Sequence, residues 1–478
     1  MIGAYLESWI DVEVWVRTFP SWGRDLYTQM PTPDQAEKIP LSMLVRKSAY
    51  GLKQSAENFL AMLDAWLAKY GFTMSMGDRC LHIFYVEPRG STAAKWIFLC
   101  IHIDDCQGVS SDNDTWNHFL SAFMTRFPCK DIGELDFHLG VSMAHDIVKG
   151  QMQLSQKPLI EKAARVLGIN PDSCYKKHVP MAQNLILQDA PADEVLTSDQ
   201  AARVANCQYR EVVGAILYIY IMSRPNIGNC VHQLCRFGSK YSIQHVDALH
   251  WLMLYLLATR DDGICYHADS SIIPHMAADS SWSGCPVTCT STFGFGIYMC
   301  GSLVAWGVGR SAFPLPTSMD SEAYSLREAF CVFIGLLKAA LSILPQLSSC
   351  APYLTLQDNT SVIDLANGLG KASKRRHIRM RVLYVIHLLA IKLFRLGWVP
   401  TDEMWADIFT KSTGKALFRK HSRTMLGDQR QIVNKNTDEL GNEQPPTATI
   451  EPDNKERKAG EHDLDVHMTD DTKDSAED

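Results

Sequence analysis

The chain has 478 residues, of which 46% are apolar and 21% are charged. This composition excludes a fibrous or wholly disordered chain and is typical of a globular protein with roughly two to four domains. The formal net charge of −7 is unevenly distributed, because residues 437–478 carry 14 acidic and 4 basic side chains, a balance of 4 − 14 = −10, which leaves −7 + 10 = +3 elsewhere. A mildly basic body with an acidic tail permits a polyanionic partner but does not demonstrate one.

The 14 cysteines include no CxxC pair, and the closest two are Cys285 and Cys289. A zinc site would require tighter pairs with matching histidines, so we expect scattered free thiols in a reducing compartment. The first residues lack a basic segment followed by an apolar one, so no signal peptide is expected. The longest apolar runs, 212–222 and 246–258, are too short or too interrupted to span a bilayer and are interpreted as core elements.

The first part of the chain predicts alternating helices and strands. Apolar spacing predicts helices and continuous or alternating apolar runs predict strands, with glycines as helix stops. The expected elements are a helix at Ala56–Tyr70 before Gly71, a buried strand at Trp96–Ile103 with a turn at Asp104–Asp105, a helix at Asn117–Phe127, a strand pair at Phe137–Met143 and Gln151–Ser155, and a helix at Lys157–Leu167 before Gly168.

The second part of the chain predicts a linker, a helical region and then a mixed domain. The linker is Pro180–Ala201, and the helical region is Tyr209–Leu257, with a break at Arg224–Pro225–Asn226. The remaining expected elements are an alternating pattern from Ile264, a glycine-rich hairpin at Phe293–Gly301, a helix at Ser321–Leu341, a strand at Tyr353–Gln357 and helices at Thr360–Asn367 and Arg376–Phe394. This order predicts a mixed α/β layer fold, followed after about Gly427 by a disordered acidic tail.

Asp104 and Asp105 form the first candidate chemical site. Two carboxylates at the end of a buried strand cannot both remain ionised comfortably without a counter-charge, and Mg²⁺ is a common solution. Taken alone, such a pair is more often a solvated turn. Its context is more specific, because SAYGLKQSAENF from Ser48, HIDD from His102 and KDIGELDFHLG from Lys130 occur in this order.

These three segments resemble the reverse transcriptase of copia-type retrotransposons, which carries LYGLKQ, a [YH]-[VI]-D-D turn and KDLGEL-x-FLG. The resemblance continues through QLSQKPLIEKAARVLGI and YREVVGAILYIYIMSRPNI and covers almost all of residues 1–427. It implies that Asp104 and Asp105 are metal-binding palm carboxylates that catalyse phosphoryl transfer with two metal ions. It also implies that Gly51, Lys53 and Gln54 lie near the template and incoming nucleotide, that Lys130 lies near the triphosphate, and that Phe137–Gly140 form the primer grip.

One family residue has no counterpart in this sequence. The family places a further palm aspartate four residues before the Ala of A-F-L, and alignment with AYLESWIDVEVWV puts that position one residue before Met1. Asp11 lies elsewhere in the pattern and is not expected to substitute. Because a two-metal site would then lack a ligand, we expect the reverse transcriptase part to be inactive in this chain alone.

Four spaced carboxylates form the second candidate site. They are Asp279 in DSSW, Glu322 in SMDSEAY, Asp358 in LQDNTSV and Asp407 in ADIFTK, with RRHIRMR before the last. Each alone would be an ordinary surface residue, but together they resemble the ribonuclease H domain of the same family. The resemblance implies that all four hold two Mg²⁺ ions. Glu322 is favoured as the helix carboxylate, and Asp320 remains the alternative.

A basic run, KASKRRHIRMR at Lys371–Arg381, precedes the last acidic motif. Such a run is usually a solvated helix face, but beside a hybrid-cutting site it favours phosphate contacts. The expected nucleic-acid-binding residues are Lys53, Gln54, Lys374, Arg375, Arg376, His377, Arg379 and Arg381. Recognition of an RNA–DNA hybrid would depend on 2′-hydroxyl groups and duplex shape. Fewer lysines follow Trp306 than in the family pattern, which would weaken the substrate grip.

The sequence therefore predicts a retrotransposon Pol fragment in which an Mg²⁺-dependent ribonuclease H cleaves RNA in RNA–DNA hybrids. The expected domains are a partial reverse transcriptase at 1–180, a linker and helical connection at 181–270, a ribonuclease H-like domain at 271–427 and the acidic tail at 428–478. Alternatives are a catalytically dead nucleic-acid-binding relic and an interaction protein with a regulatory tail. By resemblance only, the expected location is a cytoplasmic virus-like particle or the nucleus.

Overall fold

The fold is described from a computed structural model, for residues 9–17, 42–47, 52, 54–91, 93–172, 176–191, 193–366 and 376–427. Contacts divide the chain into two compact units, 1–430 and 431–478, and all of the described residues belong to the first. The elements up to residue 166 are β1 (Trp9–Arg17), β2 (Ser42–Lys47), α1 (Ser55–Tyr70), β3 (Phe72–Met74), β4 (Leu81–Val86), β5 (Lys95–His102), β6 (Asp105–Ser110), α2 (Asn113–Arg126), β7 (Phe137–His138), β8 (Val141–Asp146), β9 (Gln151–Ser155) and α3 (Lys157–Val166).

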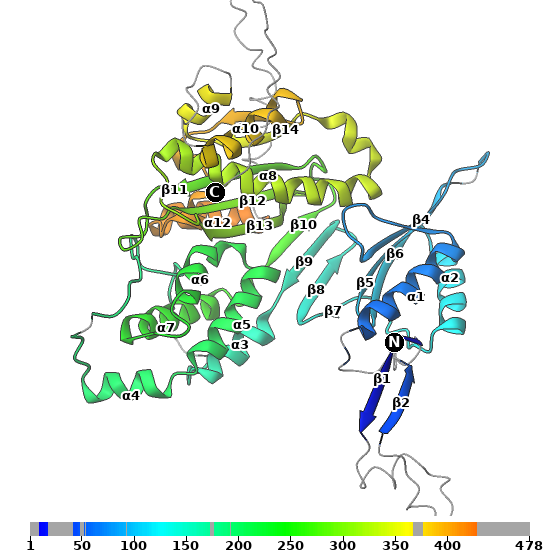
Figure 1. The fold of residues 1–478 in the computed structure, drawn as a ribbon, viewed down its shortest axis with the longest axis horizontal. Coiled ribbons are helices and arrows are strands. Elements are labelled where there is room, and N and C mark those ends of the chain that lie inside the picture. The colour runs from blue at the N-terminus through cyan, green and yellow to red at the C-terminus, as the bar shows by residue number, and fades with distance from the viewer. Residues whose placement is uncertain are drawn as a thin grey trace, which may run out of the picture. The chain divides into compact units, whose positions relative to one another are not determined.

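The following helices and strands complete the described chain (Figure 1). They are α4 (Ser198–Asn206), α5 (Tyr209–Met222), the 3₁₀ turn η4 (Pro225–Ile227), α6 (Gly228–Cys235), α7 (Ile243–Ala258), β10 (Ile264–His267), β11 (His275–Ser281), β12 (Thr292–Met299), β13 (Ser302–Arg310), α8 (Ser318–Ile343), η5 (Pro345–Cys350), β14 (Tyr353–Gln357), α9 (Thr360–Ala366), α10 (Arg376–Ala390), β15 (Phe394–Trp398), η6 (Thr401–Glu403), α11 (Asp407–Thr410) and α12 (Lys415–Leu426).

An antiparallel sheet in the order β3-β4-β5-β6 carries the first aspartate pair. Alternate residues of β5, namely Ile97, Leu99 and Ile101, are buried and pack against apolar side chains of α1 and α2. This period of two places one face of the sheet on the helices. His102 pairs with Asp105, so Ile103 and Asp104 form the hairpin turn between β5 and β6. The expected turn is confirmed, although Asp105 already belongs to β6.

A second four-stranded sheet has the order β10-β9-β8-β7. Its strand β10 comes from the segment expected to be a helical connection, yet it pairs antiparallel with β9, and Ile264 lies opposite Leu154. Gly263 leaves little room at this junction, because an added Cβ atom would lie 2.0 Å from the Leu154 carbonyl oxygen. The connection is therefore hydrogen-bonded directly to a strand of the reverse transcriptase segment.

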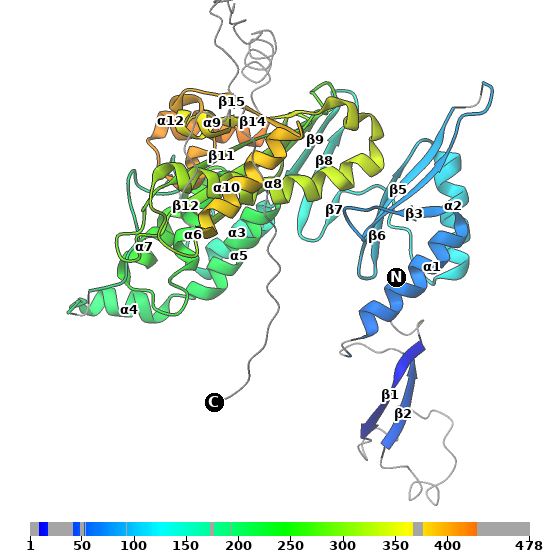
Figure 2. The same cartoon turned by 45° about the horizontal axis from the view of Figure 1, so that its top comes forward.

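The C-terminal part contains a five-stranded mixed sheet in the order β13-β12-β11-β14-β15. The first three strands are antiparallel neighbours, whereas β14 pairs parallel with β11 and β15 pairs parallel with β14. Figures 1 and 2 show the long helix α8 and helix α10 beside this sheet. The order and directions of its strands are those of a ribonuclease H-like domain, and with the earlier sheets they confirm the predicted mixed α/β class.

The two faces of this sheet have different partners. On one face Met276, Ala278 and Phe295 pack against apolar residues of α8, including Phe330. The opposite face packs against α11 and the preceding loop, and glycines there make room for aromatic rings. An added Cβ atom at Gly294 would lie 2.2 Å from Cβ of Phe409, and one at Gly296 would lie 2.7 Å from the Trp405 ring. The glycine-rich hairpin therefore allows α11 to approach the sheet closely.

A buried polar network joins the helical connection to the C-terminal helix α12. The side chain of Arg224 is fully buried, and its guanidinium donates to Asn226 Oδ1 at 3.2 Å and to the Thr259 carbonyl oxygen at 2.8 Å. Asn226 Nδ2 donates to Tyr255 Oη and to Ser422 Oγ, both at 2.8 Å. Buried polar groups require such partners, so this network fixes the break between α5 and α6 against α12.

The secondary structure differs from the sequence prediction between α10 and β15. The sequence predicts a helix at Arg376–Phe394, but α10 ends at Ala390 and Phe394 begins β15. Lys392 has a positive φ of 56°, which ends the helix and turns the chain into the sheet. The apolar residues of β15 are compatible with a helix or with a strand. The segment forms a strand because it pairs in parallel with β14. Among the described residues, no helix is long and apolar enough to cross a membrane.

We predict that Arg224→Met lowers the free energy of unfolding by about 2–4 kcal/mol, because it removes a buried guanidinium and leaves buried acceptors unsatisfied. Urea denaturation monitored by circular dichroism would measure the change. Arg203→Met is the control, since Arg203 is exposed and pairs with Asp247 at the surface. Its expected effect is within about 0.5 kcal/mol. Equal stability of the two variants would contradict a structural role for the network.

Candidate active site

Asp279 and Asp358 lie at the same edge of the five-stranded sheet. Asp279 is near the carboxyl end of β11, and Asp358 directly follows β14. Because β11 and β14 are parallel neighbours, their carboxyl ends bring both side chains together. Thr410 Oγ1 donates a hydrogen bond to Asp279 Oδ2, and Thr401 Oγ1 donates to Asp358 Oδ2 at 3.1 Å. These hydroxyl groups orient the two carboxylates.

Asp407 reaches the same place from the short helix α11, which packs on the sheet through Phe409. Carboxylate oxygens of Asp279, Asp358 and Asp407 all lie within 4.8 Å of one another. Lys411 follows Asp407 by one helical turn, and its Nζ atom lies 2.8 Å from Asp407 Oδ1 and 3.8 Å from Asp279 Oδ2. Three carboxylates and one ammonium group thus share one small volume.

The structure distinguishes the two rival acidic residues of helix α8. Glu322 is buried, and its carboxylate accepts hydrogen bonds from Ser280 Oγ at 2.9 Å and Gln357 Nε2 at 3.3 Å. Both donors lie in the strands that bear the aspartates. Asp320 instead accepts from Thr317 Oγ1 at 2.9 Å, and its own backbone N–H donates back to that N-cap hydroxyl. Glu322 therefore adjoins the aspartates, whereas Asp320 helps to start the helix.

Burial and repulsion from neighbouring carboxylates raise the pKa values of Glu322, Asp358 and Asp407. Burial is the main cause of the raised pKa of Glu322, and the Asp279 charge adds to it. The pKa of Asp358 is raised by the same two effects in the same order. Burial and then Asp279 raise the pKa of Asp407 to about 7, although Lys411 acts in the opposite direction. The pKa of Lys411 is raised, since its acidic neighbours outweigh the effect of its burial. Glu322, Asp358 and Asp407 therefore resist ionisation unless positive charge is nearby.

The aspartates of the first candidate site are less enclosed. Asp104 is half-buried in the β5–β6 turn, and Asp105 is exposed. Within the described ranges of the chain, three or more possible ligand residues converge only at Asp279, Asp358 and Asp407, and no such group includes Asp104 or Asp105. Phe137 is exposed, and the turn at Leu139 and Gly140 contacts Tyr218 of α5, whose hydroxyl donates to the Leu139 carbonyl oxygen.

Most of the predicted basic contacts cannot be placed. Lys53, Lys374 and Arg375 lie outside the described residues, and so do the side chains of Arg376, His377 and Arg379. Gln54 is half-buried at the N-terminus of α1, and its side chain makes no capping hydrogen bond. Arg381 lies with its guanidinium carbon 4.8 Å from the centre of the Tyr324 ring and 5.4 Å from that of Phe313. This stacking packs α10 against the N-terminal part of α8.

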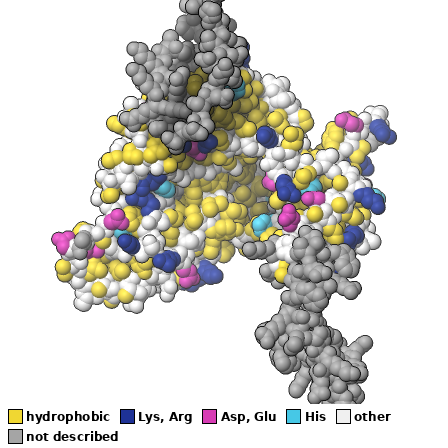
Figure 3. Space-filling model, in the orientation of Figure 1, with side chains coloured by type: hydrophobic (Ala, Val, Ile, Leu, Met, Phe, Trp, Pro, Cys, Tyr) yellow, Lys and Arg dark blue, Asp and Glu magenta, His cyan; other side chains and the backbone are white. Residues whose placement is uncertain are grey.

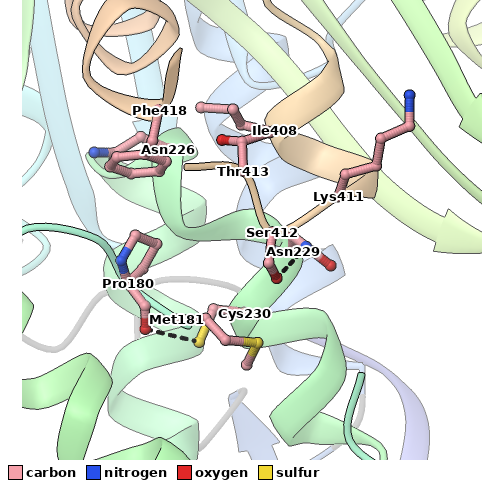
Figure 4. Close-up of a pocket in the computed structure, with 10 residues that line it drawn as sticks. All are labelled: Pro180, Met181, Asn226, Asn229, Cys230, Ile408, Lys411, Ser412, Thr413 and Phe418. Carbon is pink, nitrogen blue, oxygen red and sulfur yellow. Dashed lines mark hydrogen bonds between the residues drawn. The ribbon is translucent and has the colours of Figure 1, made fainter. Parts of the chain in front are cut away.

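A small cavity separates the helical connection from the loop after α11, and Figure 4 shows the residues that line it. Asn229 Nδ2 donates to Ser412 Oγ at 3.2 Å across this junction. The Lys411 side chain extends away from the other labelled residues (Figure 4), while its Nζ atom lies beside Asp407 and Asp279. The connection thus supports the loop that presents Lys411 to the acidic cluster.

Lys411 is a charged residue of this site that the sequence analysis did not identify. It belongs to the ADIFTK segment that supplied Asp407, and its spacing of four residues on a helix would have placed the two side chains together. Ser280, Gln357 and Thr410 were also missed, because single hydroxyl and amide groups carry no distinctive pattern. Their hydrogen bonds become visible only once β11, β14 and α11 are placed.

The fold and site together define a ribonuclease H-like domain that follows a reverse transcriptase segment. A family model for reverse transcriptase (RNA-dependent DNA polymerase) matches residues 2–183. The chain is 23% identical over 421 residues to the retrovirus-related Pol polyprotein from transposon RE2 of Arabidopsis thaliana, covering 88% of this chain and 27% of that one. It is 22% identical over 389 residues to the Pol polyprotein from transposon TNT 1-94 of Nicotiana tabacum, covering 81% and 28%.

The reverse transcriptase match and the similarity to Pol polyproteins from transposons support the predicted resemblance to a copia-type retrotransposon Pol fragment. The chain spans about a quarter of the length of these curated relatives. A solved structure of the N-terminal RNase H domain of Rv2228c from Mycobacterium tuberculosis, a fusion with maltose binding protein, is also similar. It has 17% sequence identity and a TM-score of 0.21 and covers 32% of this chain and 99% of that chain.

We predict that Glu322→Gln stabilises the metal-free protein at alkaline pH. A carboxyl group whose folded-state pKa is raised contributes stability below its unfolded pKa, which is lost as the pH rises through the folded pKa. Gln stays neutral, so the variant should match the wild type near about pH 4 and be more stable near about pH 9, by on the order of 1 kcal/mol. Urea unfolding in EDTA at both pH values would measure this.

Glu328→Gln is the matched control on the same helix, because Glu328 pairs with Arg327 near the surface. Its effect should be small and should not differ between the two pH values. A Glu322→Gln variant that is less stable than the wild type at alkaline pH would show that repulsion among the carboxylates does not govern the stability of the metal-free site.

Proposed function

We propose that this chain is a hydrolase that cleaves the RNA strand of RNA–DNA hybrids at the site formed by Asp279, Glu322, Asp358 and Asp407. The observation that carries the proposal is the convergence of three aspartate carboxylates within 4.8 Å at one edge of the sheet. Glu322 adjoins them through Ser280 and Gln357. Their order along the chain also matches the motifs of the ribonuclease H domain that the sequence resembles.

The donor set fits Mg²⁺. The residues offer only carboxylate oxygens, which are the hard ligands that Mg²⁺ prefers, and no cysteine or histidine belongs to the group. Clustered carboxyl groups with raised pKa values gain the most from a nearby cation. Asp279, Asp358 and Asp407 would hold the cations together with Glu322. When bound, two such ions would activate water and stabilise the leaving 3′ oxygen.

The other residues of the site hold these carboxylates in place. Thr410 and Thr401 orient Asp279 and Asp358, and Ser280 and Gln357 restrain Glu322. Lys411 offsets part of the negative charge, and its partly exposed side chain is free to turn toward solvent as the charge of the site changes. Such positioning of ligands by neighbouring hydrogen bonds is what a metal-dependent nuclease requires.

Polymerisation is a less favoured activity of this chain. Asp104 and Asp105 occupy an open hairpin turn, and the described residues bring no third ligand residue to it. We therefore assign hybrid cleavage to the ribonuclease H-like domain and propose that the reverse transcriptase segment does not extend a primer alone. A catalytically dead protein that still binds nucleic acid is the second candidate, and a comparison of hybrid cleavage with hybrid binding separates the two.

We predict that the wild-type chain cleaves a labelled RNA–DNA hybrid in Mg²⁺ and that EDTA abolishes cleavage. Asp358→Asn should lower the cleavage rate by at least about a hundredfold, since it removes an anionic ligand from the cluster. Denaturing gels of 5′-labelled RNA would measure the rate. Asp364→Asn is the control, because this exposed aspartate lies on α9, a short distance further along the chain. A folded wild-type protein that binds the hybrid without cutting it would favour the catalytically dead alternative.

A further inference from the structure

Two arginines meet beside the loop between β11 and β12. Arg310 ends β13, and its guanidinium donates to Thr288 Oγ1 at 2.7 Å and to Thr290 Oγ1. Arg236 directly follows α6 of the helical connection and lies 3.8 Å from Cys285 Sγ in the same loop. The site is therefore composite, with one arginine from the connection and one from the ribonuclease H-like sheet.

Neither guanidinium forms an ion pair with an acidic side chain within the described part of the chain. No carboxylate oxygen of the described residues lies within 4 Å of Arg236 or Arg310, whereas several other described arginines have one at that distance. Arg236 is exposed, so the pair is open to a ligand from solvent. On the face shown in Figure 3, basic side chains lie in separate small groups and not in one broad patch.

The surroundings of the arginine pair favour negative charge. The pKa of His232 on α6 is lowered to about 4, by burial and then by Arg236 and Arg310, so this side chain stays neutral. Burial acts to raise the pKa of Cys285, but hydrogen bonds from Thr288 and Val287 and the charge of Arg310 together lower it to about 6. The charge of Asp189 acts on Arg236 from beyond ion-pair distance, so Asp189 and an ionised Cys285 offset part of the positive charge of the pair.

The arginine pair and the acidic cluster lie at the same strand ends of the sheet, where β11 and β13 finish. Asp279 of β11 pairs with Gly294 of β12, and Gly294 pairs with Val308 of β13. Arg310 therefore lies two strands away from Asp279 in the sheet and two residues further along β13 than the position level with Asp279. Ordinary strand spacing then separates the Cα atoms of Asp279 and Arg310 by about 12 Å. The alternation of strand residues also puts Arg310 on the face of the sheet that bears Asp279. A nucleic acid seated at the carboxylates would extend over this distance within a few nucleotides.

We propose that Arg236 and Arg310 form a phosphate-binding site for the sugar–phosphate backbone of the hybrid that is cut at Asp279. This inference rests on the proposed function and adds a substrate contact that spans the connection and the ribonuclease H-like domain. Guanidinium groups bind phosphate oxygens through several N–H donors, and the Thr288 and Thr290 hydroxyls hold Arg310 in place for this contact. Such a contact positions the duplex without reading its sequence.

The test measures hybrid binding at several salt concentrations, in an Asp358→Asn background in Mg²⁺ so that the hybrid is not cut. The variants are Arg236→Gln, Arg310→Gln and their combination, with Arg236→Lys/Arg310→Lys as the charge-retaining pair. Arg395→Gln is the matched control. Arg395 is exposed on β15, the outer strand of the same sheet on the side away from β13. Fluorescence anisotropy of a labelled RNA–DNA hybrid gives Kd, and thermal melting confirms that each variant is folded.

We expect the double Gln variant to raise Kd about tenfold and to reduce the slope of log Kd against log salt by about one, the loss of one phosphate contact. The Lys pair should keep most of the slope, and Arg395→Gln should behave as its parent protein. A folded double Gln variant with the parent Kd and slope would overturn the arginine site and leave the proposed function standing. A parent protein that shows no salt-dependent hybrid binding would overturn both.

Discussion

Electrostatic repulsion among buried carboxylates is the constraint on which the C-terminal half of the molecule is built. Carboxylate oxygens of Asp279, Asp358 and Asp407 lie within 4.8 Å of one another. Asp279 and Asp407 are buried and Asp358 is half-buried, so water screens their charges incompletely. Such a cluster persists because the surrounding structure fixes each member independently. β11 and β14 deliver two aspartates through parallel pairing, α11 delivers the third, and α8 adds Glu322. Hydroxyl groups and Lys411 reduce the repulsion that remains.

The two-sided packing of the five-stranded sheet makes this arrangement possible. One face rests on α8 through a continuous apolar core, while Gly294 and Gly296 open the other face to Phe409 and Trp405. The helical connection contributes to the second face. A Cβ atom added at Gly228 of α6 would lie 3.0 Å from Phe409 and 3.2 Å from Val308, and Trp306 Nε1 donates to the Tyr220 carbonyl oxygen at 3.1 Å. The connection therefore supports the site, although the sequence alone indicates a separate segment.

Prediction from sequence succeeds best where a motif and a secondary-structure boundary coincide. Asp279 and Asp358 were predicted from motifs that resemble a ribonuclease H domain, and in the structure each lies at or next to the carboxyl end of a strand. The sequence favours Glu322 over Asp320 without excluding Asp320, because both residues lie at the start of the same helix. The hydrogen bonds of Glu322 with Ser280 and Gln357, and of Asp320 with Thr317, distinguish them.

Features that depend on contacts distant in sequence could not be predicted. The predicted helix at Arg376–Phe394 extends too far, because Phe394 suits the end of a helix or the start of a strand until its pairing with β14 is known. Arg236 and Arg310 are 74 residues apart (310 − 236) and belong to no common motif, so their meeting is visible only in the fold. The network of Arg224, Asn226 and Ser422 is hidden for the same reason, although its first two members belong to a family motif.

The central claim is that the four carboxylates form a binding site for catalytic divalent cations, and crystallography with Mn²⁺ tests it most directly. Mn²⁺ prefers the same oxygen ligands as Mg²⁺ and scatters anomalously, so its positions in crystals of the wild-type protein can be located without ambiguity. Our account predicts anomalous peaks among Asp279, Glu322, Asp358 and Asp407. Ordered carboxylates without such a peak at saturating Mn²⁺, or strong peaks confined to other parts of the molecule, would contradict it.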